Sequence, residues 1–218
     1  MLYCLICLTL SSYAQTQELK LAADIWPPFT NVKAEKSILS DLVQEALERM
    51  EVKSTMDILE LTEVIDRVNS GIYDGSPGLW ISPEREEIFF FSKPYLYNQL
   101  VLVGRKGADV SAVSFNDLGR KKIGVVDHYA YGDFENNEEL IIVPGASDQK
   151  NLENLLSDKI DYMIVDALLI QYMLKYQLND VTKHLAIGQQ PCWSNPFIWP
   201  WVKKWRMPRR SSNNLTSR

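Results

Sequence analysis

Residues 71–95 of the chain read GIYDGSPGLWISPEREEIFFFSKPY, and the rest of the chain is best understood around this stretch. A turn rich in Gly and Asp leads into a short apolar segment that we expect to form a strand, and a Ser-Pro break ends it. A charged turn follows with Arg85 at its centre, and then an aromatic run. A strand that ends at such a turn presents a cation at the carboxyl edge of a sheet, where open α/β sheets bind ligands. The alternative is a surface ion pair between Arg85 and one of its neighbouring glutamates.

The composition is that of a globular protein: 218 residues, 46% hydrophobic and 23% charged, with a net charge of -5. This length allows one large domain or two lobes of about 100 residues each. The negative charge gives no general attraction to nucleic acid, so no nucleic-acid partner is expected. Gly-rich phosphate loops and metal-ligand spacings of histidines and acids are absent from the sequence, so neither a cofactor nor a metal is expected.

Residues 1–14 are expected to form a signal peptide. Residues 2–10 are apolar, and Ser12-Tyr13-Ala14 places small residues where a signal peptidase reads them, although no Lys or Arg precedes Lys20. The alternative is a buried first strand. A signal peptide predicts export to the periplasm, and its removal leaves Cys192 as the only cysteine, so no disulfide is expected in the mature chain.

After this segment, strands and helices alternate along the chain. The expected strands cover residues 19–23, 52–59, 99–105, 122–126, 140–143, 162–165 and 184–187. The expected helices cover residues 38–50, 61–70, 114–118, 149–157 and 167–175. This alternation predicts parallel sheets covered by helices, in two lobes at residues 15–104 and 105–187. The second lobe offers its own ligand edge at residues 127–131 and at Asp166.

The order and spacing of several motifs resemble the type II periplasmic solute-binding proteins of solute-binding family 3, the polar amino-acid class. The matching motifs are residues 24–29, Tyr73-Asp74-Gly75, residues 82–85, 91–95, 122–126 and 161–166. The resemblance covers about residues 19–190. It implies an α/β two-lobe clamshell, acting as a monomer, that closes on a small solute for the permease of an ABC-type membrane transporter.

The resemblance also implies roles for single residues. Arg85 would grip the α-carboxylate of an amino-acid-like or other carboxylate-bearing solute with its bidentate fork, and Asp166 would take the α-ammonium. Trp26 would stack on the solute side chain, and Asp24 would touch its distal group. One charge pair would come from each lobe, so binding would favour closure.

Two positions depart from the family pattern. Trp80 stands where the family often has a small hydroxyl residue that donates to the carboxylate. Residues 128–131, His-Tyr-Ala-Tyr, replace a glycine and hydroxyl loop that completes an anion site at a helix N-terminus. We therefore expect His128 and Tyr129 to line an aromatic site that suits an aromatic or atypical solute. Trp80 as a purely packing residue remains the alternative.

Two other functions stay open. An enzyme on the same fold, similar to the cyclohexadienyl dehydratases, would use His128 as its base, but a lone loop histidine more often stacks or binds. We therefore expect no enzyme and assign no catalytic residue. A ligand-sensing domain of a receptor is the other alternative.

Residues 188–218 form an atypical return segment. From Cys192 onward several tryptophans and a cluster of basic residues follow no helix or strand period. We expect the return to the first lobe to be incomplete or altered, with a sheet edge left unpaired; a basic, aromatic membrane or partner patch is the alternative. Because reading the codons one base out of frame after Pro191 restores a β-alternating pattern, we hypothesise a frameshift, which the gene sequence would test.

Overall fold

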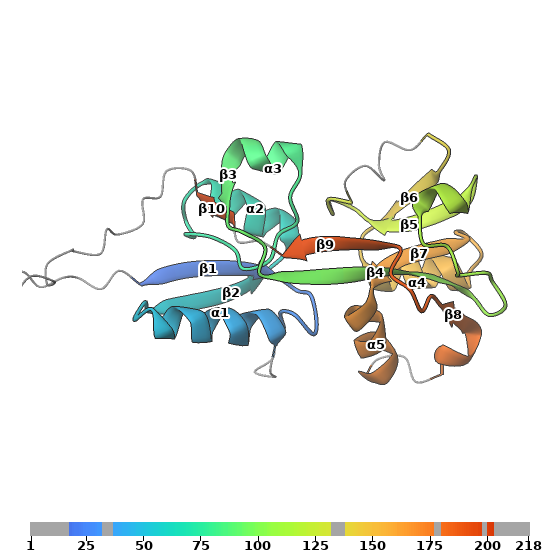
Figure 1. Ribbon diagram of the computed structural model, residues 1–218, viewed down its shortest axis with the longest axis horizontal. Coiled ribbons are helices and arrows are strands. Elements are labelled where there is room, and N and C mark those ends of the chain that lie inside the picture. Colours follow the sequence, from blue (N-terminus) through green and yellow to red (C-terminus); the bar gives the residue numbers. More distant parts are fainter. Residues whose placement is uncertain (1–17, 32–36, 132–137, 177–179, 198–199, 203–218) are drawn as a thin grey trace, which may run out of the picture.

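A computed structural model shows two α/β lobes joined by two neighbouring strands (Figure 1). It describes residues 18–31, 37–131, 138–176, 180–197 and 200–202. The expected signal peptide lies outside these residues. None of the helices in the described ranges is both long and apolar enough to cross a membrane.

The first lobe takes its strands from distant parts of the chain. Strands β1 (Leu19–Asp24) and β2 (Ser54–Leu59) pair in parallel, whereas β3 (Phe89–Phe91) and β10 (Pro200–Val202) pair antiparallel. Three helices belong to this lobe: α1 (Ile38–Arg49), α2 (Leu61–Asn69) and α3 (Pro83–Ile88). Helix α2 buries Val64 and Val68, four residues apart, so one apolar stripe faces the sheet.

In the described part of the chain the second lobe has a six-stranded sheet, in the order β6-β5-β7-β4-β8, with β9 on β4. The strands are β4 (Leu96–Arg105), β5 (Lys122–Val126), β6 (Ile141–Gly145), β7 (Tyr162–Asp166), β8 (Leu185–Ile187) and β9 (Trp193–Phe197). The helices are α4 (Asp148–Leu156) and α5 (Ala167–Tyr176), with short 3-10 turns at Phe115–Leu118 and Thr182–His184. Strands β5, β6 and β7 are parallel, and β4 runs antiparallel to β7.

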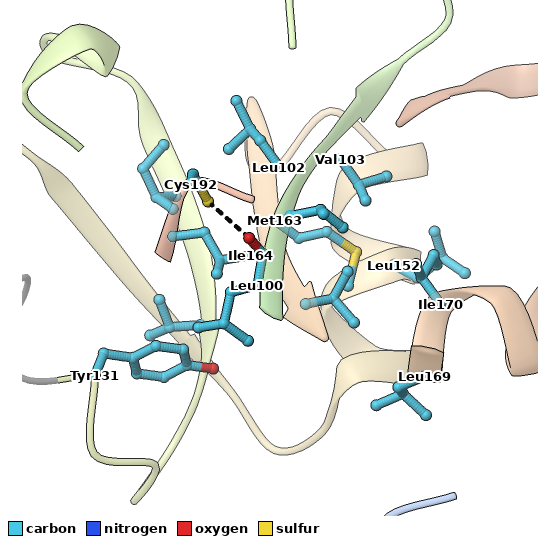
Figure 2. Packing of buried hydrophobic residues seen from close by; sticks show 14 of the residues in the cluster. Leu100, Leu102, Val103, Tyr131, Leu152, Met163, Ile164, Leu169, Ile170 and Cys192 are labelled. Atoms are coloured by element: carbon cyan, nitrogen blue, oxygen red, sulfur yellow. Dashed lines mark hydrogen bonds between the residues drawn. The ribbon is translucent and has the colours of Figure 1, made fainter. Parts of the chain in front are cut away.

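The largest apolar core lies under this second sheet (Figure 2). Side chains from β4, β7, α4 and α5 meet there: Leu100, Leu102, Val103, Met163, Ile164, Leu152, Leu169 and Ile170. Burial of apolar area at roughly 25 cal/mol per Å² makes this packing the main support of the lobe. The core therefore gives a firm base to the carboxyl ends of β5 and β7, where Asp127 and Asp166 lie.

Strand β4 connects the lobes. Its first half, Leu96 to Leu100, pairs with β9, and its second half, Leu100 to Gly104, pairs with β7. Strands β4 and β9 lie side by side between the lobes in Figure 1. The second half of β4 therefore pairs with the second lobe, although the sequence prediction placed residues up to 104 in the first lobe. The division into residues 15–104 and 105–187 stays a prediction.

The stretch around Arg85 differs from the sequence prediction. Residues 76–82 form no strand of their own, and Gly75 makes an isolated bridge to Leu21 of β1. Arg85 lies in helix α3 rather than in a turn. The helix forms here because the Ser82 hydroxyl accepts a hydrogen bond from the Arg85 N–H (3.3 Å) and because Pro83 suits the first helical position.

The expected unpaired edge of the first lobe was wrong, because β10 pairs with β3 in that lobe. Strand β9 also returns along β4, in register from Trp193 opposite Leu100 to Phe197 opposite Leu96. Ladder pairing uses backbone groups, so a segment without apolar alternation still forms it. The frameshift remains a hypothesis about the gene.

Candidate functional site

The first lobe brings an acid and a tryptophan to the space between the lobes. Strand β1 ends at Asp24, and the chain turns at once, since the Trp26 carbonyl accepts hydrogen bonds from Phe29 and Thr30. This turn holds the Trp26 ring in a buried position, 7% exposed. The carboxylate of Asp24, which is half-buried, accepts a hydrogen bond from the Tyr129 hydroxyl of the other lobe.

Arg85 is buried between the lobes, with 7% of its surface exposed. Its Nη1 donates to the Trp80 carbonyl at 2.8 Å, and its Nη2 donates to the His128 carbonyl at 2.9 Å. His128 belongs to the second lobe and has a φ of 63°, in the left-handed region that few residues other than glycine adopt. The guanidinium therefore joins the two lobes through backbone oxygens.

Four aromatic rings, Trp26, Trp80, Tyr129 and Tyr131, form what we call the aromatic cluster. Ring centroids lie 5.3 Å apart for Trp26–Trp80, 5.4 Å for Trp80–Tyr129 and 5.5 Å for Trp80–Tyr131. All three pairs meet edge to face, the arrangement that the ring quadrupoles favour. Trp80 is 4% exposed and touches all three other rings, so it is the centre of the cluster.

A chain of buried hydrogen bonds connects Trp80 to the second lobe. Trp80 Nε1 donates to Asn98 Oδ1 at 3.0 Å, and Asn98 Nδ2 donates to Asp166 Oδ2 at 2.9 Å. The other carboxylate oxygen of Asp166 accepts the N–H groups of Leu168 (2.8 Å) and Leu169 (2.9 Å) at the start of α5. Asp166 thus accepts three hydrogen bonds from the protein itself.

Two cavities flank the contact between Arg85 and the loop at His128–Tyr129. The first, which we call the Arg85-side cavity, has a volume of about 610 Å³ and is also lined by Asp66, Glu84 and Asp127. The second, the Asp148-side cavity, has about 520 Å³ and is lined by four acids, Asp24, Glu60, Asp127 and Asp148. Between them, a gap enclosed by Asp24, Trp26, Trp80, Arg85 and Tyr129 measures only about 20 Å³.

The electrostatics of the Asp148-side cavity favour positive charge. Burial raises the pKa of Asp24 to about 6; the charge of Glu60 also raises it, while hydrogen bonds from Ile25 and Tyr129 lower it. Burial raises the pKa of Asp148 to about 7, and the charges of Asp166 and Asp24 raise it further. The charge of Arg85 lowers the pKa of Asp24, but less than burial and Glu60 raise it, and a cationic ligand would stabilise the charged form of both carboxylates.

His128 lines both cavities. The imidazole is 63% exposed, and its Nε2 lies 3.5 Å from Asp127 Oδ2. The contact it makes with Arg85 comes from the backbone carbonyl instead. Within the residues that the structure describes, no group of three or more acids, histidines or cysteines has the geometry of a metal site.

The structure brings most of the expected site residues together. Asp24, Trp26, Trp80, Arg85 and Tyr129 enclose the same small gap, and Asp166 reaches that gap through Asn98.

Sequence reasoning missed Asn98, Glu60 and Asp148. Asp148 begins α4 just after β6, at the same sheet edge as Asp127, so its position at the carboxyl end of a parallel strand was the signal that could have found it.

Two α/β lobes linked by a strand pair, with a polar cleft between them, define a two-lobed solute-binding protein. The model of the bacterial extracellular solute-binding proteins, family 3, matches residues 19–197. The chain belongs to this family.

Curated relatives and solved structures agree with this assignment. Two Escherichia coli proteins are similar to this chain. Putative ABC transporter arginine-binding protein 2 is 26% identical, and the match covers 76% of this chain and 68% of that protein. ABC transporter arginine-binding protein 1 is 25% identical, and the match covers 69% of this chain and 63% of that protein.

Among solved structures, the GluR0 ligand-binding core with L-glutamate has a TM-score of 0.72 at 20% identity, covering 88% of this chain and 87% of that one. Holo ArgBP from T. maritima has a TM-score of 0.68 at 21% identity, covering 85% and 83%. These identities are low, so the two structures show the fold alone.

Proposed function

We propose that this chain is an extracytoplasmic solute-binding protein that captures a small, amino-acid-like solute by its positive charge and presents it to an ABC-type membrane transporter. The observation that carries this proposal is the Asp148-side cavity, with four acids and no Lys or Arg among its lining residues. Its volume of about 520 Å³ suits a small solute.

The relatives support a cationic solute. Both similar E. coli proteins are named as arginine-binding proteins of ABC transporters. The fold by itself selects no charge, because it also occurs in a core that is complexed with L-glutamate. The negative charge of the lining residues supports a cationic solute. A transporter permease as partner, the periplasm as location, a monomeric state and the absence of catalysis are parts of the same proposal.

The test is calorimetric titration with arginine, lysine and ornithine, with glutamate and leucine as comparison solutes. We expect one saturable site for at least one basic solute. We also expect mass spectrometry to recover that solute chemically unchanged after incubation with the protein. Tight binding of glutamate, or turnover of the solute, would contradict the proposal.

A pair of variants ties the binding to the cavity. Asp148→Asn removes one carboxylate without changing its size, so the affinity for the basic solute should fall by roughly tenfold or more, as for loss of a hydrogen bond to a charged group. Asp117→Asn removes an exposed acid that lies away from both cavities and serves as the matched control. Equal affinity in both variants would show that the solute does not use this cavity.

A further inference from the structure

We infer that Trp80 determines specificity by closing off the guanidinium of Arg85, so that the solute is held by its cationic end and its carboxylate is not required. This inference rests on the proposed function and deepens it. It predicts that amines and guanidines without a carboxylate bind as well as the corresponding amino acids.

The first support is the space at Arg85. The gap between Arg85, Trp80 and the facing Tyr129 is about 20 Å³, and a single water needs about 10–15 Å³ of such space. A carboxylate with its α-carbon does not fit there. One N–H of each Nη atom already donates to a backbone carbonyl, that of Trp80 or that of His128, so a fork made from these two N–H groups would cost both bonds.

The second support is that Trp80 is held in place from two sides. Its ring contacts Trp26, Tyr129 and Tyr131, and its Nε1 donates to Asn98. Moving the indole aside would break the hydrogen bond to Asn98 and leave a buried polar group unpaired. Asn98 therefore acts as a positioning residue for Trp80.

The third support concerns the two other routes to a zwitterion site. Arg85 also lines the Arg85-side cavity, but Asp66, Glu84 and Asp127 line it too, so a solute carboxylate entering there meets like charges. Asp166, the expected partner of an α-ammonium, already accepts hydrogen bonds from Asn98, Leu168 and Leu169. The Asp148-side cavity is lined by four acids and by no Lys or Arg, so the cationic end of the solute would bind there.

The experiment compares matched pairs that differ by one carboxylate: arginine with agmatine, lysine with cadaverine, ornithine with putrescine and glutamate with 4-aminobutyrate. Dissociation constants are measured for the wild-type chain, Trp80→Ser, Trp80→Phe and the exposed-aromatic control Tyr97→Ser. Trp80→Ser opens the gap and restores a small hydroxyl next to Arg85. Trp80→Phe keeps a smaller aromatic ring and loses the hydrogen bond to Asn98.

We expect the wild-type chain and Tyr97→Ser to bind both members of a cationic pair within about threefold, because no interaction with the carboxylate is lost. Trp80→Ser should favour the amino acid over the amine by roughly a hundredfold, as expected when an arginine fork becomes available. Asn98→Ala and Trp80→Phe both lose the hydrogen bond between Trp80 and Asn98, so they should shift the ratio the same way but by less, and Asn98→Gln should restore it in part. A purely structural role would lower both affinities and leave their ratio unchanged.

The outcomes separate this inference from the proposed function. A wild-type preference for amino acids of about a hundredfold, unchanged in Trp80→Ser, overturns the inference and leaves the proposed function standing. If the wild-type chain binds no cationic pair but Trp80→Ser binds amino acids, the proposed function fails and the role of Trp80 is supported. If neither protein binds any member, both are overturned.

Discussion

Asp24 and Asp148 are the residues whose protonation governs how this cleft meets a solute. They belong to different lobes and line the same cavity. Their pKa values, about 6 and about 7, both lie above the usual 3.8 because burial disfavours the charged form. At neutral pH the free protein therefore carries less negative charge in the cleft than four ordinary acids would.

The pH dependence of binding follows from these two groups. A cation stabilises the deprotonated carboxylates, so binding lowers their pKa values and releases protons. The affinity for a basic solute should rise from pH 5 to pH 7.5, by roughly tenfold or more, and level off above. Calorimetry in two buffers of different ionisation enthalpy measures the proton release. The double variant Asp24→Asn/Asp148→Asn should release no protons on binding. Proton uptake by the wild-type chain on binding would contradict this account.

The raised pKa values of Asp24 and Asp148 make the free protein less stable as pH rises, whereas they make solute binding stronger. Between about pH 4 and pH 7 the folded state holds protons that the unfolded chain has already released. The contribution of Asp24 and Asp148 to the free energy of unfolding therefore decreases as pH rises through this window. Urea denaturation without solute measures the free energy of unfolding across this pH window. That free energy should decrease less with rising pH in Asp148→Asn than in the wild-type chain, and an equal decrease in both would contradict this account.

At the scale of elements, β4 is the strand on which the two lobes depend. It supplies core residues to the second lobe and places Asn98, which is 2% exposed, between Trp80 and Asp166. Buried polar groups in such a chain are costly to leave unpaired. The connection between the lobes is therefore held by specific hydrogen bonds as well as by the backbone of β4 and β9.

Asn98→Ala tests this connection. It leaves the Trp80 N–H and one Asp166 oxygen without their partner, so we expect a loss of about 1–3 kcal/mol in the free energy of unfolding. Chemical denaturation measures this value. Tyr97→Ser, at the exposed neighbouring position, should change stability much less, by about 0.5 kcal/mol. If both variants lost the same free energy of unfolding, the cause would be strand propensity and not the hydrogen bonds of Asn98.

The sequence predicts the longer elements well and the shortest ones poorly. Strand β5 matches its expected range, and α1 and α2 end within a residue of theirs, because apolar periodicity marks both. Helix α3 has only six residues, too few for a period, and its signal was the Ser82 cap followed by Pro83. Asn98 could not be found, since its partners are 18 and 68 residues away.

For the whole molecule, the return of the chain closes the architecture. Strand β9 runs back along β4, and β10 completes an antiparallel pair with β3 in the first lobe (Figure 1). The described residues after Cys192 therefore pair with strands of both lobes. This differs from the sequence prediction, in which an atypical composition implied an edge without a partner. Composition describes side chains, whereas the ladder depends on backbone groups.

Truncation tests this contribution. A chain that ends at Cys192 loses β9 and β10 and exposes the edges of β4 and β3, so it should aggregate or melt without a cooperative transition. A chain that ends at Val202 keeps both strands and is the matched control. Size-exclusion chromatography and thermal melts measure the difference. If the shorter chain melted as cooperatively as the longer one, β9 and β10 would not support the fold.

The position of Cys192 makes its thiol a chemical reporter of the pairing between β9 and β4. Its Sγ lies 3.4 Å from the Leu100 carbonyl of β4 (Figure 2), the side chain is 6% exposed, and burial raises the pKa of the thiol to about 11. In the folded chain the sulfur is therefore both covered and protonated, and alkylating reagents react with the thiolate. With Cys4 and Cys7 replaced by serine, the alkylation rate of Cys192 should follow how often β9 separates from β4. A solute that holds the lobes together would slow that reaction, and the slowing would give its binding constant without any optical signal from the ligand.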